Sequence, residues 1–115
     1  MAIVEDSFLV ARGLATLLER HGCEIVGLAG TPEAALELID AAEFDVAVLD
    51  IMLGNRSCAD VALRLREQGR EIIFVSGYGD LGMLPSELRS LPRLSKPVEP
   101  ALLVQAIREA VATTG

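Results

Sequence analysis

The sequence is poor in the residues on which many catalytic and metal-binding sites depend. Its 115 residues include one histidine, His21, and two cysteines, Cys23 and Cys58. A single histidine excludes a multi-histidine metal site and argues against a serine–histidine triad. The two cysteines do not share a metal-ligand spacing, so we expect buried free thiols in a cytoplasmic protein.

Basic residues and long apolar runs are scarce as well. Ten Lys and Arg residues face 17 Asp and Glu residues, and the formal net charge is −7. This balance argues against sequence-independent binding to nucleic acid and against attraction to an anionic membrane. No apolar run approaches the roughly 20 residues that a membrane-spanning helix needs. The first six residues contain no basic region, which argues against a signal peptide.

The residues that are abundant predict one compact α/β domain over residues 1–115. Hydrophobic residues make up 51% of the chain and charged residues 23%, which is typical of a globular protein. Short apolar runs predict strands at residues 2–4, 24–29, 46–49, 72–75 and 93–95. Each strand is followed by a helical pattern, and the five repeats predict a doubly wound parallel sheet with the strand order 2-1-3-4-5.

Helix start signals support this division of the chain. Ser7 is a candidate N-cap of the first helix, whose apolar residues recur at helical spacing at Val10, Leu14, Leu17 and Leu18. Thr31 and Pro32 begin a second helix that extends to about residue 41. Ser57 and Asp60 fit a capping box for the third. A short helix is expected at roughly residues 85–90, and Pro100 begins the last.

The apolar run at residues 46–49 ends in a carboxylate, Asp50. Open α/β folds keep their ligands at the carboxyl ends of their strands. At the same edge, Glu5 and Asp6 follow the first strand, Ser76 ends the fourth and Lys96 follows the fifth. Because the predicted order makes the first and third strands neighbours, we expect the three carboxylates to lie together.

Such a cluster requires a positive counter-charge. Two carboxylates 4 Å apart repel each other by about 4 kcal/mol in an intermediate dielectric, and one lysine does not balance three of them. Mg²⁺ fits best, because it takes one or two carboxylates and keeps water ligands for a phosphate. The set predicts a site for a transferred phosphoryl group, with Asp50 as the nucleophile and Ser76 and Lys96 contacting the phosphoryl oxygens.

These residues resemble the signature of two-component response-regulator receiver domains, the CheY-like family with a flavodoxin-like fold. The resemblance covers the whole chain. It implies that a sensor histidine kinase or a phosphotransfer protein phosphorylates Asp50, and that the domain controls a downstream effector protein or output domain. It also implies a phosphoacceptor that is not a turnover enzyme, and it allows a homodimer.

The resemblance further implies the roles of individual residues. Mg²⁺ would be bound by Asp6, Asp50 and the main-chain carbonyl of Met52, with Glu5 acting through water. Ser76 and Lys96 would contact the phosphoryl group, and the bond between Lys96 and Pro97 would be cis.

The sequence departs from the family at the position three residues before the lysine. Family members usually carry an aromatic residue there, and this chain carries Arg93. Residues 74–78 resemble the F-A-T-G-Y variant of the family, which also lacks that aromatic residue. We therefore hypothesise that Tyr78 and the loop up to Leu91 carry the signal. We expect Arg93 to be a solvated residue near the sheet edge, with a contact to the acidic cluster or to the partner as the less favoured alternative.

Other interpretations of the same residues are weaker. Gly77, Gly79 and Gly82 match G-x-G-x-x-G after a strand, but Pro85 follows too soon for the long helix that would hold a dinucleotide. A haloacid-dehalogenase-like phosphatase needs a second acid where Met52 stands. A degenerate receiver that only binds proteins and a small Mg²⁺-dependent hydrolase are further alternatives. A degenerate receiver is disfavoured because the acidic residues, Ser76 and Lys96 are all present. A hydrolase is disfavoured because the sequence offers no clear additional base to activate water.

Overall fold

The centre of the molecule is a parallel sheet of five strands. The computed structural model describes residues 1–77 and 79–114. The sheet consists of β1 (Ala2–Val4), β2 (Gly27–Ala29), β3 (Val46–Asp50), β6 (Glu71–Ser76) and β7 (Arg93–Ser95), in the order β2-β1-β3-β6-β7. All four pairings are parallel. Because β6 and β7 are the fourth and fifth strands of this sheet, the predicted order 2-1-3-4-5 is confirmed.

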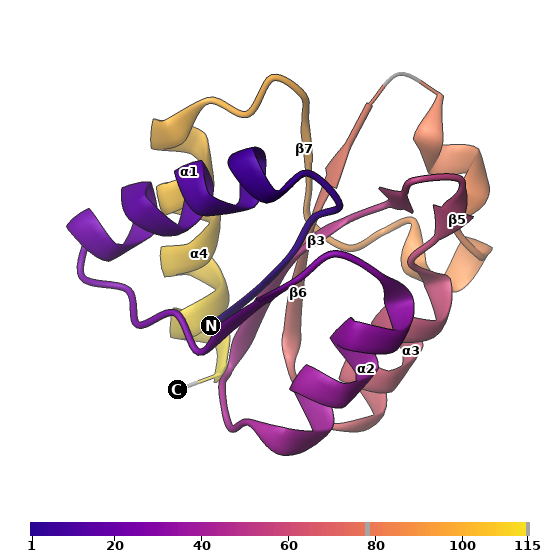
Figure 1. The fold of residues 1–115 in the computed structure, drawn as a ribbon, viewed down its shortest axis with the longest axis horizontal. Coiled ribbons are helices and arrows are strands. Elements are labelled where there is room, and N and C mark those ends of the chain that lie inside the picture. Colours follow the sequence, from indigo (N-terminus) through magenta and orange to yellow (C-terminus); the bar gives the residue numbers. More distant parts are fainter. Residues whose placement is uncertain (78, 115) are drawn as a thin grey trace.

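Two helices cover each face of the sheet (Figure 1). The helices are α1 (Phe8–Arg20), α2 (Pro32–Ala41), α3 (Ala59–Glu67) and α4 (Pro100–Thr114). The helices α1 and α4 lie on one face, and α2 and α3 lie on the other. The predicted starts of the first two helices are confirmed, because the side chains of Ser7 and Thr31 accept hydrogen bonds from the backbone N–H groups of Val10 and Ala34.

The strand β3 is buried along its whole length, as expected for a strand with helices on both sides. Side chains alternate between the two faces of a strand, and this divides the core into two apolar clusters. Ile73 of β6 packs in the cluster under α1 and α4, and its neighbour Phe74 packs in the cluster under α2 and α3. Both side chains have no solvent exposure.

The chain after β3 differs from the expected loop. The strands β4 (Met52–Leu53) and β5 (Arg56–Ser57) form a small antiparallel hairpin, and Gly54 in its turn has a φ of 67°. The predicted capping box at Ser57 does not form. Cys58 is the N-cap residue of α3, and the Ser57 hydroxyl instead accepts from the backbone N–H of Ala59 at 3.0 Å. Pairing within the hairpin places Ser57 one position too early to cap the helix.

Two other segments also differ from the prediction. The second strand is shorter than residues 24–29, because only Gly27–Ala29 pair with β1. Between β6 and β7 there are two 3₁₀ segments, Asp80–Met83 and Ser86–Leu88, in place of one short helix. Pro85 lies between them, and buried Leu84 and Leu88 hold this connection against the α2–α3 side of the core.

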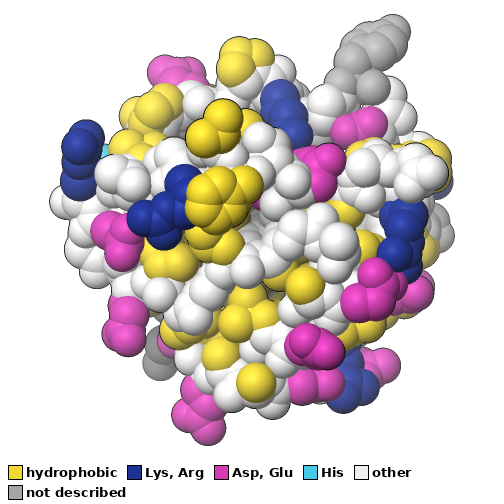
Figure 2. Space-filling view, in the orientation of Figure 1, with side chains coloured by type: hydrophobic (Ala, Val, Ile, Leu, Met, Phe, Trp, Pro, Cys, Tyr) yellow, Lys and Arg dark blue, Asp and Glu magenta, His cyan; other side chains and the backbone are white. Residues whose placement is uncertain are grey.

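The surface agrees with the acidic composition. Figure 2 shows the basic side chains of the described residues standing apart from one another on the face in view, with acidic side chains among them. Within residues 1–77 and 79–114, no helix is both long and apolar enough to cross a membrane.

Candidate phosphoryl and metal site

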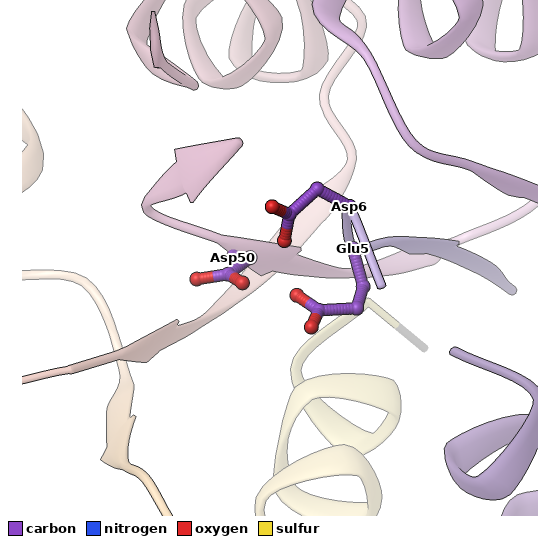
Figure 3. Close-up of side chains that lie close together, drawn as sticks. All are labelled: Glu5, Asp6 and Asp50. Atoms are coloured by element: carbon purple, nitrogen blue, oxygen red, sulfur yellow. The ribbon is translucent and has the colours of Figure 1, made fainter. Parts of the chain in front are cut away.

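Three carboxylates meet at the carboxyl edge of the two central strands. Val4 pairs with Leu49, so Glu5 and Asp50 are the next residues on adjacent strands. One carboxylate oxygen from each of Glu5, Asp6 and Asp50 lies within 4.8 Å of the other two. Figure 3 shows the three side chains turned toward one another. The strand order thus produces the expected acidic cluster.

The three carboxylates differ in their surroundings. Glu5 is 5% exposed and Asp50 is 3% exposed, whereas Asp6 faces solvent. The Asp6 carboxylate accepts a hydrogen bond from the backbone N–H of Gly54 at 3.0 Å, which ties it to the β4–β5 hairpin. Asp50 Oδ1 is buried and has no hydrogen-bond partner among the described residues. A buried oxygen without a partner is costly, by about 1–3 kcal/mol, so this atom is suited to a ligand that supplies positive charge.

Lys96 supplies part of that charge. It is the only lysine of the chain. Its Nζ donates a hydrogen bond to Asp50 Oδ2 at 2.7 Å and lies 3.6 Å from Glu5 Oε2. Burial lowers the pKa of Lys96, but the hydrogen bond to Asp50 and the negative charges of the cluster outweigh burial, so the net direction is upward. The backbone N–H of Lys96 donates to the Ser76 carbonyl at 2.8 Å, and the bond between Lys96 and Pro97 is cis, as the resemblance implies.

One lysine does not neutralise three carboxylates. Burial, a hydrogen bond to Asp50 and the negative charge of Asp50 together raise the pKa of Glu5 to about 8, although Lys96 acts in the opposite direction. Without a further cation, Glu5 therefore holds a proton near neutral pH. The donor set is made of carboxylate oxygens, which fits a hard divalent cation such as Mg²⁺.

The buried thiol of Cys58 is near this cluster but is not suited to its chemistry. Burial, and then the negative charge of Asp50, raise the pKa of Cys58 to about 12. A thiol with that pKa stays protonated at neutral pH and is a poor nucleophile. Both cysteines are free, as predicted, but only Cys58 is buried, whereas Cys23 is half-buried.

Ser76 lies at the end of β6, next to the strand that carries Asp50. It is 1% exposed. Its hydroxyl accepts a hydrogen bond from Nη1 of Arg93 at 3.3 Å. Arg93 itself is exposed, as expected, but the expectation of a merely solvated residue is wrong, because its guanidinium contacts the site. The register of β6 and β7 does not by itself indicate this contact, because Phe74 pairs with Arg93 and Ser76 with Ser95.

Two further sequence predictions are not decided by this geometry. Tyr78 lies outside the described residues. Met52 is half-buried in β4, and none of the contacts given above involves its main-chain carbonyl, so its role as a metal ligand stays a prediction.

The glycine motif does not form a nucleotide site in the described part of the chain. The Asp80 carboxylate accepts from the backbone N–H of Gly77 at 2.8 Å and closes a tight turn. The 3₁₀ segment that follows has four residues, Asp80–Met83. A long helix, whose N-terminus would hold a pyrophosphate, does not begin there.

Comparison with known proteins identifies the family. The model of the response regulator receiver domain matches residues 1–108. The transcriptional regulatory protein PdtaR of Mycobacterium tuberculosis is 30% identical over 112 residues, which are 95% of this chain and 55% of that protein. The transcriptional regulatory protein DltR of Streptococcus agalactiae is 34% identical over 114 residues, which are 94% of this chain and 50% of that protein. The chain thus spans about half the length of these relatives.

Solved structures of similar proteins have the same fold. The solution structure of SdrG from Sphingomonas melonis Fr1 is 30% identical, with a TM-score of 0.81, and the match covers 96% of this chain and 93% of that one. The receiver domain of PhyR from Erythrobacter litoralis is 25% identical, with a TM-score of 0.82, and the match covers 96% and 87% of the two chains. Membership of the F-A-T-G-Y variant stays a prediction. With the model match and these likenesses, the chain belongs to the response regulator receiver domain family.

Proposed function

We propose that residues 1–115 form a phosphoacceptor receiver domain that takes a phosphoryl group on Asp50 and changes conformation to control a partner. The observation that carries this proposal is the burial and hydrogen bonding of the Asp50 carboxylate. This carboxylate is buried, with one oxygen bonded to Lys96 and the other without a partner in the described part of the chain. An aspartate buried for packing alone would have both oxygens satisfied.

The proposed reaction needs few protein groups. A carboxylate oxygen of Asp50 attacks the phosphorus of the donor, an O–P bond forms, and the bond from phosphorus to the donor's leaving group breaks. Lys96 neutralises charge on the phosphoryl oxygens and Ser76 donates a hydrogen bond to one of them. Attack by water on the same phosphorus later returns the carboxylate and releases inorganic phosphate. The domain therefore phosphorylates and dephosphorylates itself but is not a turnover enzyme.

The residues present fit a bound Mg²⁺. Asp6, Asp50 and the main-chain carbonyl of Met52 would hold it, with Glu5 acting through water. Bound there, Mg²⁺ supplies positive charge to the carboxylates and to the phosphoryl oxygens. The unpartnered Asp50 oxygen and the raised pKa of Glu5 are the features of this chain that support the assignment.

Receiver domains interact with histidine kinases or phosphotransfer proteins and with output domains. For this chain, the donor is a sensor histidine kinase or a phosphotransfer protein in the cytoplasm, and the target is an effector protein or an output domain, with a homodimer as one possible form of the active state. Tyr78 and the connection up to Leu91 transmit the change. If phosphorylation leaves the amide chemical shifts of residues 77–93 unchanged, transmission through this segment is contradicted.

The intact mass of the protein tests the phosphoacceptor directly. After incubation with Mg²⁺ and acetyl phosphate, the wild type gains one phosphoryl group and acetate leaves, whereas Asp50→Asn gains none. Asp45→Asn is the matched control, because Asp45 is exposed and precedes β3 at the opposite edge of the sheet. EDTA abolishes the adduct. A wild type that gains no phosphoryl group and binds no Mg²⁺ would instead indicate a receiver that acts only by binding proteins.

A further inference from the structure

The hydrogen bond between Arg93 and Ser76 has a fixed direction. A guanidinium carries donors only, whereas a hydroxyl carries one hydrogen and two acceptor lone pairs. Arg93 Nη1 therefore donates, and Ser76 Oγ accepts, at 3.3 Å. The hydrogen of the Ser76 hydroxyl stays available for another acceptor. In the described part of the chain, the contact with Arg93 is the hydrogen bond that the hydroxyl makes.

The strand register places Ser76 at the same edge of the sheet as the proposed phosphoacceptor, one residue beyond the pairing partner of Asp50. Asp50 pairs with Val75, and Ser76 is the next residue on β6. Arg93 lies on β7, on the other side of β6 from β3. The strands that carry Asp50, Ser76 and Arg93 therefore lie side by side in that order, with Ser76 on the strand between the other two. A donor on one side of a hydroxyl directs its hydrogen toward the other side.

We propose that Arg93 is a positioning residue of the phosphoryl site, which holds and polarises the Ser76 hydroxyl so that it donates to a phosphoryl oxygen on Asp50. This inference rests on the proposed function. A hydroxyl that accepts from a cationic donor becomes a stronger donor itself, because hydrogen bonds in a chain polarise one another.

Arg93 acts through this hydrogen bond and not mainly through its charge. The side chain is exposed, and the attraction between an exposed charge and the cluster is screened by salt. Lys96 already supplies a direct cationic contact to Asp50. The effect of Arg93 should therefore depend on the presence of the Ser76 hydroxyl, and this dependence separates positioning from a general electrostatic effect.

A double-mutant cycle tests the dependence. The rate of the phosphoryl adduct with acetyl phosphate and Mg²⁺ is measured by intact mass for the wild type, Arg93→Met, Ser76→Ala and the double variant. Methionine keeps the length of the stem but has no N–H donor. We expect Arg93→Met to slow phosphorylation about tenfold, the size of one charge-assisted hydrogen bond, and to have no further effect when Ser76 is already alanine.

Two controls distinguish positioning from damage to the fold. Arg20→Met removes an exposed arginine at the far end of α1 and should leave the rate unchanged. Arg93→Lys keeps a cationic donor and should recover part of the rate. The thermal midpoint of Arg93→Met should match that of the wild type, because Arg93 is exposed.

The outcomes separate this inference from the function on which it rests. If the wild type is phosphorylated on Asp50 and Arg93→Met is phosphorylated equally fast, the receiver function stands and the role of Arg93 is refuted. The role is also refuted if Arg93→Met slows the Ser76→Ala protein as much as the wild type. If no variant, including the wild type, accepts a phosphoryl group, the proposed function fails and this inference fails with it.

Discussion

Lys96 is the residue on which the electrostatics of the site depend. Among residues 1–77 and 79–114, it is the basic side chain that forms ion pairs with the cluster, at 2.7 Å from Asp50 and 3.6 Å from Glu5. Its side chain is 38% exposed, whereas those of its partners are almost completely buried. Removing it leaves buried carboxylates without a counter-charge, which costs more than the pair itself contributes.

Lys96→Met should therefore destabilise the metal-free protein. Removing one partner of a fully buried pair costs about 3–5 kcal/mol, and the exposure of Lys96 reduces this to about 1–2 kcal/mol. Urea unfolding in EDTA measures the loss, with Arg20→Met as the control for removing an exposed cation. Excess Mg²⁺ should recover most of the difference, because it replaces the missing positive charge. Equal unfolding midpoints for Lys96→Met and the wild type in EDTA would contradict this interpretation.

Glu5 should make the stability of the metal-free protein depend on pH. Its pKa is raised from 4.5 to about 8 in the folded state. Between these values the folded protein binds a proton that the unfolded chain releases. The contribution of Glu5 to stability is therefore fully present below pH 4.5 and is lost as the pH rises through 8. Relative to Glu5→Gln, which has no such proton, the wild type should lose on the order of 3 kcal/mol between pH 5 and 9.

The urea midpoint of both proteins, measured in EDTA across that pH range, gives the difference. A parallel pH dependence of the wild type and Glu5→Gln would show that Glu5 ionises normally. With Mg²⁺ present, the loss at high pH should shrink, because the cation favours the ionised carboxylate.

The β4–β5 hairpin is the element that orients Asp6. The backbone N–H of Gly54 in its turn donates to the Asp6 carboxylate, and Gly54 has a φ of 67°. That region of backbone conformation is accessible to glycine but costs other residues roughly 1–2 kcal/mol. The turn therefore couples the conformation of one glycine to the position of a candidate metal ligand.

Gly54→Ala should lower the free energy of unfolding by about 1 kcal/mol and weaken Mg²⁺ binding, because the strained turn shifts the N–H that holds Asp6. Gly13→Ala is the matched control. Gly13 lies within α1, where an added Cβ meets no atom within 4 Å beyond its chain neighbours and the adjacent backbone of the helix, so alanine there should stabilise the protein by roughly 0.5–1 kcal/mol. Calorimetric titration with Mg²⁺ and urea unfolding measure both effects. Unchanged Mg²⁺ affinity in Gly54→Ala would show that the hairpin does not orient Asp6.

The elements also show where sequence patterns are informative and where they are not. The five main strands and the starts of α1 and α2 could be predicted, because apolar runs and capping residues are local signals. The β4–β5 hairpin could not be predicted, because strands of two residues are too short to show a periodic pattern. The apolar pattern of α1 was misleading only in part, because Leu18 is buried as the pattern indicates but Val10 is not. The helix buries Ala11, Ala15 and Leu18, while Val10 is 45% exposed, because the small alanines face the sheet.

The candidate site was more predictable than some of these elements. Glu5, Asp50, Ser76 and Lys96 each end or follow a strand, and parallel strands bring those positions to one edge regardless of how loops fold. The contact of Arg93 with Ser76 was missed because it depends on the side-chain conformation of an exposed residue on an edge strand. No local pattern in the sequence encodes that conformation.

The whole molecule is held together by one sheet that contributes to two apolar clusters. Ile73 and Phe74 are adjacent in β6 but pack on opposite faces. Because both faces share the same strands, neither cluster can unfold while the other keeps its packing. We therefore expect a single cooperative transition for this domain, which has a radius of gyration of 12.6 Å.

Ile73→Ala and Phe74→Ala should each destabilise the entire domain by about 3–4 kcal/mol, the usual cost of truncating a buried side chain of this size. Unfolding followed by far-ultraviolet circular dichroism and by hydrogen exchange should report the same transition for both variants. An intermediate that keeps exchange protection in α2 and α3 but loses it in α1 and α4 would show that the two faces are independent.

Chemical mapping of the phosphorylated residue distinguishes Asp50 from its two acidic neighbours. Borohydride reduces an aspartyl phosphate to homoserine, and peptide mass spectrometry after treatment with acetyl phosphate and Mg²⁺ locates the reduced residue. The geometry of the site predicts reduction at position 50 and at no other carboxylate, and none in protein that was treated with EDTA. Reduction at Glu5 or Asp6, or at no position under any condition, would contradict the assignment of Asp50 as the phosphoacceptor.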